Sequence, residues 1–249
     1  MIKLDDTRYA DEDVCKTDIC LPEGKDFPTV VYFHGGGLEA GDKAEGNLRE
    51  IAEYAAARGI AFLSANYRMY PYAKFPQYIE DAANAVSFAV REIKNYGGNG
   101  DIFVSGQSAG AYLAMMLCFD KRYLMKNGVS PLQIKGWLIE SAQQTVHFNV
   151  LRERGEDKRK ERLDEAAPLW FVDGELLFTK LRLLCYDDDI VCRRKQNELL
   201  YESVLHFSPT ADIGLKVLQG THCRASAVKE NGKYPFAEML CDFVFGREI

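Results

Sequence analysis

The sequence lacks any long apolar run. No window approaches the roughly 20 consecutive apolar residues that a membrane-spanning helix needs. The first residues, MIKLDD at positions 1–6, carry no apolar core behind a basic start, so we expect no secretion signal, no membrane partner and a cytoplasmic location. No stretch is enriched in proline or glycine as a linker would be, and 249 residues predict a single domain over 1–249.

Paired cysteines and an excess of positive charge are also missing. The seven cysteines are odd in number and scattered, and none forms a Cys-x-x-Cys pair, so we expect neither a disulfide framework nor a metal site. Lys and Arg number 31 against 37 Asp and Glu, a net charge of −6, which argues against nucleic acid as a partner. Because a Gly-x-Gly-x-x-Gly motif and a phosphate loop are absent, we expect no cofactor.

What the sequence does contain is an alternation of strand-like and helix-like segments. Apolar residues three and four positions apart predict helices near 48–55 and 79–93, and residues 109–119 are apolar on nearly all sides. This alternation predicts an α/β fold with a mainly parallel sheet covered by helices on both faces. Buried strands are expected at Val30–Phe33, Ile60–Asn66, Ile102–Ser105, Gly136–Glu140, Leu181–Tyr186 and Leu215–Leu218, and an antiparallel edge strand at Val14–Leu21.

The strongest chemical signal is Gly106-Gln107-Ser108-Ala109-Gly110, which follows the strand Ile102–Ser105 and precedes a helix. A serine there stands on a sharp strand-to-helix turn, and the glycines allow the turn because a Cβ at their positions would crowd it. Such a turn lifts the serine oxygen clear of the sheet and places the next backbone N–H beside a developing oxyanion. Ser108 is therefore the candidate nucleophile and Ala109 an oxyanion donor.

A second signal is His34-Gly35-Gly36-Gly37, directly after the strand Val30–Phe33. Three glycines in a row have an entropic cost that a simple turn does not require. We expect the N–H groups of Gly36 and Gly37 to approach a substrate oxygen closely. His34 is expected to brace this loop rather than to act as a base.

In this order, the two motifs resemble the α/β-hydrolase superfamily. The similarity is greatest to the hormone-sensitive-lipase-like carboxylesterases and their small acetyl- or feruloyl-esterase relatives. Asn66-Tyr67-Arg68, Phe75-Pro76 and Asp81 add to the resemblance, which runs to the C-terminus and is strongest over residues 30–110. Gln107 and Leu38 depart from the family pattern, at positions where they could reshape the substrate pocket.

The resemblance implies an acid and then a histidine after the serine. His222, in Gly220-Thr221-His222 after the last strand, stands where the family carries its catalytic histidine. The family acid precedes an apolar pair and has a Gln seven residues beyond, which fits Asp189 with Gln196. A slip of one residue would select Asp188 instead. Adjacent carboxylates repel, so only one of Asp187, Asp188 and Asp189 is expected to be buried against the histidine.

These assignments predict a serine carboxylesterase for short-acyl or sugar-linked esters, which forms an acyl-enzyme. Ser108 attacks the ester carbonyl, His222 transfers its proton, and Asp189 orients the imidazole. The expected partner is a small-molecule ester, with self-association left open. An amidase or peptidase of the same fold, arylformamidase-like or oligopeptidase-like, is the first alternative. A non-catalytic binding relative is the second.

One segment differs in composition. Residues 151–165 contain six basic and six acidic side chains, which predicts a solvated helix or an insertion held by local ion pairs. The functional alternative is a mobile cover over the site. An apolar lid of the kind that a lipase needs is not expected from these residues.

Overall fold

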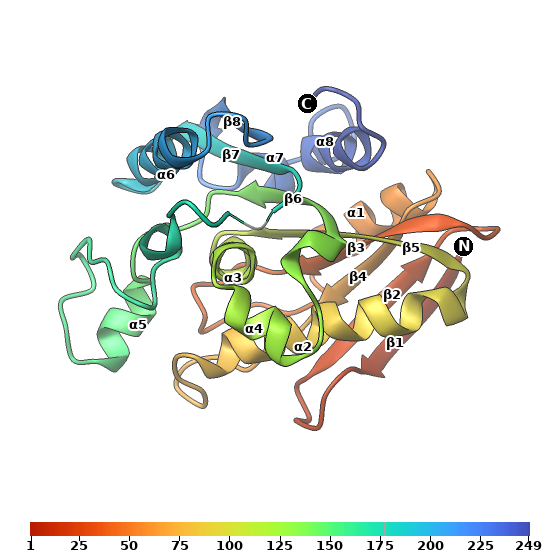
Figure 1. Ribbon diagram of the computed structural model, residues 1–249. Helices are drawn as coiled ribbons and strands as arrows, with labels where there is room; N and C mark the ends of the chain where they lie inside the picture. Colours follow the sequence, from red (N-terminus) through yellow and green to blue (C-terminus); the bar gives the residue numbers. More distant parts are fainter. Residues whose placement is uncertain (177) are drawn as a thin grey trace.

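In the computed structural model, which describes residues 1–176 and 178–249, the described strands form one twisted sheet (Figure 1). The strands lie in the order β1-β2-β4-β3-β5-β6-β7-β8. From β4 to β8 every neighbouring pair is parallel, whereas β1 and β2 join the sheet in antiparallel fashion. The strands are β1 (Ile2–Arg8), β2 (Lys16–Leu21), β3 (Phe27–Phe33), β4 (Ala61–Ala65), β5 (Gly98–Gln107), β6 (Ile134–Glu140), β7 (Leu181–Asp188) and β8 (Ile213–Thr221).

The edge position predicted for the first strand is wrong. The segment predicted at Val14–Leu21 contains β2, which is antiparallel as expected but pairs with β4 on one side and with β1 on the other. The edge strand is β1, whose residues are largely exposed on both faces. A strand of this kind carries no apolar alternation, so the periodicity of side chains could not reveal it.

Helices cover both faces of the sheet, as predicted. Figure 1 shows α2, α3 and α4 along one face and α1 and α8 on the other. Apolar residues of α6 join the core on the side of α2 and α3, and those of α1 and α8 form a second core. The helices are α1 (Gly46–Ala56), α2 (Gln77–Glu92), α3 (Ala109–Phe119), α4 (Lys121–Lys126), α5 (Phe148–Glu153), α6 (Arg193–Phe207), α7 (Arg224–Ala227) and α8 (Pro235–Val244), with 3₁₀-helices η1 (Ile93–Tyr96), η2 (Pro131–Gln133) and η3 (Pro168–Phe171).

Helix α3 lies at the centre of the molecule, where every one of its residues is buried. Its neighbours are strands β5, β3 and β6 and helix α2. A helix that is apolar on all sides requires this kind of burial, which agrees with the prediction for 109–119. No helix within the described ranges is both long and apolar enough to cross a membrane.

Two glycines let the sheet and α3 meet without side chains between them. A Cβ on Gly110 would lie 2.0 Å from the carbonyl oxygen of Phe33 in β3, and one on Gly106 would lie 2.6 Å from the carbonyl carbon of Gly110. Both distances are far inside van der Waals contact, so only glycine fits. The close approach places the N-terminus of α3 directly above the carboxyl ends of β3 and β5.

We predict that Gly110→Ala lowers the free energy of unfolding by about 3 kcal/mol, because the added methyl group must push α3 away from β3. Urea titration followed by circular dichroism measures this loss. Gly46→Ala is the matched control, since nothing lies within 4 Å of a Cβ at Gly46. A Gly110→Ala protein as stable as the control would contradict the steric account.

Candidate active site

Ser108 lies on the predicted sharp turn between β5 and α3. Its backbone is in a strained conformation, with φ 52° and ψ −112°, as expected of a serine exposed above a sheet on a tight elbow. The N–H of Ser108 donates to the carbonyl oxygen of Glu140 at 2.9 Å, which ties the turn to the end of β6. The serine side chain is thereby presented at the carboxyl edge of the parallel strands, where α/β proteins place their ligands.

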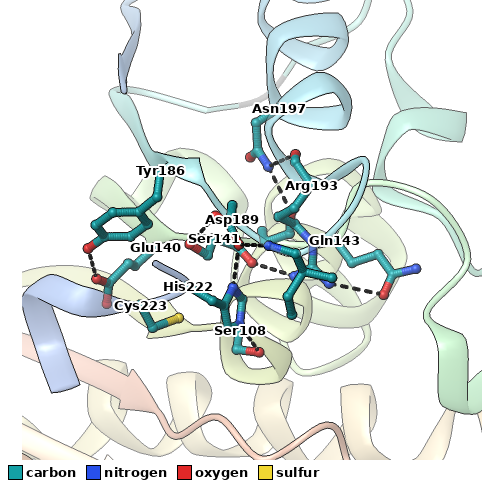
Figure 2. Close-up of polar contacts among 12 residues, drawn as sticks. Ser108, Glu140, Ser141, Gln143, Tyr186, Asp189, Arg193, Asn197, His222 and Cys223 are labelled. Carbon is teal, nitrogen blue, oxygen red and sulfur yellow. Dashed lines mark hydrogen bonds and ion pairs between the residues drawn. The ribbon is translucent and has the colours of Figure 1, made fainter. Parts of the chain in front are cut away.

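His222 joins Ser108 to Asp189, although the three residues come from distant parts of the chain. Its Nε2 lies 2.8 Å from Ser108 Oγ, and its Nδ1 lies 2.5 Å from Asp189 Oδ1. Figure 2 shows the three side chains in one continuous line of contacts. A hydroxyl bonded to an imidazole, itself oriented by a buried carboxylate, is the arrangement that activates serine as a nucleophile.

The structure places Asp189 against the histidine and leaves its neighbours in solvent. The Asp189 side chain is 1% exposed, and that of His222 is 23% exposed. Asp187 and Asp188 are both exposed, and Asp187 accepts the N–H of Gly220. Of the three carboxylates, only that of Asp189, which lies just beyond the end of β7, is buried.

Asp189 is kept ionised by hydrogen bonds on both of its oxygens. Burial acts to raise the pKa of this carboxyl, but the bonds from His222 and from Ser141 outweigh burial and hold the pKa below the usual value. Ser141 Oγ donates to Asp189 Oδ2 at 2.7 Å, and the N–H of Ile190 donates to Oδ1 at 2.8 Å. Ser141 lies in no sequence motif, so the sequence alone does not indicate its role.

The glycine loop after β3 faces the same site. The carbonyl oxygen of Gly36 accepts the N–H groups of Glu39 at 3.1 Å and Ala40 at 3.0 Å. Because the C=O and N–H of a trans peptide point in opposite directions, the N–H of Gly37 points away from that turn. A Cβ on Gly35 would lie 3.4 Å from the Cβ of Ser108, so the loop runs directly beside the serine.

Ala109 provides a further donor. It is the first residue of α3, and the first N–H groups of a helix have no partner within the helix. The positive end of the helix dipole also lies here, where a negative charge is stabilised. The glycine loop and the start of α3 thus both lie next to Ser108, and the N–H groups of Gly36, Gly37 and Ala109 remain the predicted oxyanion donors.

His34 does not join the catalytic contacts. It is fully buried, its Nδ1 lies 2.8 Å from the carbonyl oxygen of Gly35, and its ring stacks on Tyr67 with centroids 4.5 Å apart. Burial lowers the pKa of this imidazole, which favours its neutral form. These contacts agree with the predicted bracing role.

A buried polar network lies behind the histidine. Tyr186 OH donates to Glu140 Oε1 at 2.5 Å and accepts the N–H of Ala225 at 2.7 Å. Ser226 Oγ donates to Gln107 Oε1. Since Ala225 and Ser226 belong to α7, immediately after His222, this network fixes the loop that carries the imidazole. Figure 2 shows Glu140 and Tyr186 on one side of the three contacting residues.

A buried guanidinium lies on the other side of Asp189. Arg193, 3% exposed at the start of α6, donates from Nη1 to the carbonyl oxygen of Ser141 at 2.5 Å and from Nη2 to Gln143 at 3.4 Å. Burial lowers its pKa, and the charge of Asp189 opposes that effect. Arg193 therefore ties the loop after β6 to α6. Sequence reasoning missed it because long-range contacts of this kind leave no local pattern.

The charged segment 151–165 begins in α5 and continues as turns. Its ion pairs are largely internal, such as Arg154–Asp164 at 2.7 Å and Arg162–Glu156 at 2.7 Å, which confirms the prediction of an insertion held by local pairs. In the described part of the chain, no cluster of three His, Cys, Asp or Glu side chains could hold a metal ion.

A serine elbow on a mainly parallel sheet, followed in the chain by the acid and the histidine, defines an α/β-hydrolase. The chain belongs to the BD-FAE family, an esterase family of that superfamily, whose model matches residues 17–151. The match covers more than half of the chain and includes the glycine loop and Ser108. Asp189 and His222 lie beyond it.

Individual relatives share about a third of their residues with this chain, or fewer, over the parts that align. A probable isoprenylcysteine alpha-carbonyl methylesterase of Arabidopsis thaliana is 33% identical over 109 residues, 43% of this chain and 22% of the relative. The chain thus spans under a quarter of that protein. The versiconal hemiacetal acetate esterase of Dothistroma septosporum is 28% identical over 177 residues, 68% of this chain and 51% of the relative. A truncated carbohydrate esterase from gut microbiota has the same fold, with TM-score 0.77 at 15% identity over 99% of this chain and 96% of that one.

The buried Glu140 carboxyl predicts a pH-dependent effect on stability. Burial raises its pKa, against opposing hydrogen bonds from Ser226 and Tyr186 and the nearby His222. As pH rises through the range between the unfolded and folded pKa values, the unfolded chain releases this proton first, so the carboxyl progressively favours unfolding. Glu140→Gln removes this contribution. We predict that the melting temperature of Glu140→Gln minus that of wild type becomes more positive by a few degrees between pH 4 and pH 7.

Differential scanning calorimetry across that pH range measures the effect. Glu202→Gln, on the exposed side of α6, is the control for the loss of one carboxylate. A Glu140→Gln difference that is flat, or that decreases as pH rises, would contradict the assignment.

Proposed function

We propose that the protein is a carboxylesterase that hydrolyses short-acyl or sugar-linked esters through an acyl-enzyme on Ser108. The observation that carries the proposal is the unbroken line of contacts from Ser108 Oγ through His222 to the buried Asp189. The family membership and the glycine loop beside Ser108 support it.

In the first half of the reaction, Ser108 Oγ attacks the ester carbonyl carbon while His222 Nε2 accepts the hydroxyl proton. The carbonyl oxygen becomes an oxyanion, which the N–H groups of Gly36, Gly37 and Ala109 stabilise. Asp189 holds Nδ1 of the imidazole and stabilises its charged form. When the tetrahedral intermediate collapses, the alkoxide leaves with the proton from His222, and the acyl group remains on Ser108.

In the second half, a water molecule takes the place of the alcohol. The partial exposure of the His222 side chain, 23%, gives water access to the imidazole. His222 removes a proton from this water, which attacks the acyl carbon, and the same oxyanion donors act again. The carboxylic acid leaves as the proton returns to Ser108, so the enzyme ends in its starting state.

The substrate class rests on the relatives. The family name denotes bifunctional feruloyl and acetyl esterases, one curated relative is an acetate esterase, and one structural neighbour is a carbohydrate esterase. Acetyl and feruloyl groups on sugar hydroxyls are therefore the esters that we propose.

Ser108→Ala is expected to reduce kcat for p-nitrophenyl acetate at least about 10³-fold, because the nucleophile is lost while the oxyanion donors remain. Initial-rate kinetics measure the loss. Ser208→Ala, at the C-terminus of α6, is the matched control and should retain wild-type rates. Full activity of the Ser108→Ala protein would refute the proposal.

For substrates, we expect kcat/KM to be at least about 10-fold higher for p-nitrophenyl acetate than for the octanoate, the scale on which a pocket separates ligands by size. Acetylated xylose and feruloylated arabinose should be hydrolysed, and the matched acetanilide should not. An octanoate preference, or faster cleavage of the amide, would overturn the short-acyl ester assignment.

A further inference from the structure

The segment that follows β6 returns to the glycine loop at the start of α5. Asn149, the second residue of α5, is fully buried, and its Nδ2 donates to the carbonyl oxygen of Gly37. The ring of Phe148 packs on the same residue, with its Cζ 2.9 Å from the place where a Cβ on Gly37 would lie. Two adjacent side chains of α5 therefore contact the loop that holds the oxyanion donors.

A loop of three glycines needs such support because glycine restricts the backbone so little. Gly36 and Gly37 have φ values of 102° and 67°. The peptide group that precedes Gly37 is anchored by the bonds from Glu39 and Ala40 to Gly36. The peptide group that follows Gly37 is anchored by Asn149. The N–H of Gly37 belongs to the preceding peptide group, and the bond from Asn149 to the following one limits the rotation of the Gly37 backbone that would turn this N–H away.

Only the nitrogen of the Asn149 side-chain amide makes a hydrogen bond within the described part of the chain. Its Nδ2 has the Gly37 carbonyl, whereas its Oδ1 is buried without a hydrogen-bond partner in the described part of the chain. A buried acceptor without a partner costs free energy, so an apolar residue of similar size would suit the packing alone at least as well. The donor to Gly37 is the feature of Asn149 that packing does not explain.

An ion pair also joins α5 to the glycine loop, but unlike the Asn149 contact it lies on the surface. Arg152 and Glu39 form an ion pair on the surface, with side chains 38% and 41% exposed. Exposed pairs of this kind contribute little, because water and salt screen them. This pair therefore serves as an internal comparison for the buried contact.

We propose that Asn149 is a positioning residue for the oxyanion hole: its amide holds the peptide group that follows Gly37, which restricts rotation about the Gly37 backbone and so keeps the preceding peptide group, which carries the Gly37 N–H, in place. The inference rests on the proposed function, since it assumes that Gly37 stabilises an oxyanion. The segment inserted between β6 and β7 then acts on catalysis as a fixed support for the loop, and no movement of a cover is required.

The test compares Asn149→Leu with wild type and with the control Arg152→Gln. We expect Asn149→Leu to lower kcat for p-nitrophenyl acetate about 10- to 100-fold, up to the loss caused by removing an oxyanion donor, with KM within about twofold. The inhibition constant of a trifluoromethyl ketone, whose adduct with Ser108 carries an oxyanion, should rise by the same factor as kcat/KM falls. Arg152→Gln should change each value less than about twofold.

A structural role alone would lower the melting temperature and the amount of active enzyme without changing ketone affinity per active site, so both are measured. Asn149→Ala repeats the comparison if Asn149→Leu folds poorly. Wild-type kcat and ketone affinity in both variants would overturn the inference while Ser108→Ala remains inactive. Activity of Ser108→Ala equal to wild type would instead overturn the proposed function itself.

Discussion

The 2.8 Å contact between His222 Nε2 and Ser108 Oγ is the interaction on which the chemistry of this protein depends. The two residues are 114 positions apart in the sequence, and the pairing of the adjacent parallel strands β5, β6, β7 and β8 brings them together. Ser108 is fixed at the end of β5 by the close approach of α3, which only glycine at 106 and 110 allows. His222 is fixed at the end of β8 by bonds to the turn that follows it.

Much of the support for this contact comes from buried polar groups rather than from the apolar core. Tyr186 donates to Glu140 and accepts the N–H of Ala225, which fixes α7 behind the histidine. Ser141 donates to Asp189 Oδ2, the oxygen that does not contact His222. Ser108, Ser141 and Cys223 each have a positive φ, at 52°, 55° and 55°. Left-handed backbone at non-glycine residues is strained, and it persists where surrounding contacts determine it. Each of the three loops that meet at the site thus carries one such residue.

The local patterns of the sequence predicted the parallel strands, the central helix and the sharp turn at Ser108 correctly, because each has a periodicity or a steric requirement that a short window contains. Strand β1 was missed because its exposed faces leave no apolar alternation. The choice between Asp188 and Asp189 depended on where His222 lies, and the local pattern around β7 does not contain that position. Ser141, Arg193 and Asn149 act through contacts with distant segments, so nothing in their own neighbourhoods marks them.

The account makes Ser108, His222 and Asp189 one chemical unit, and covalent labelling tests this most directly. The protein is treated with diethyl p-nitrophenyl phosphate, and the modified peptide is mapped by mass spectrometry while the release of p-nitrophenol gives the rate. The account predicts one phosphoryl group on Ser108, added far more slowly in His222→Ala and Asp189→Asn because the hydroxyl then lacks its activated base. Labelling of a different residue, or equal rates in all three proteins, would contradict it.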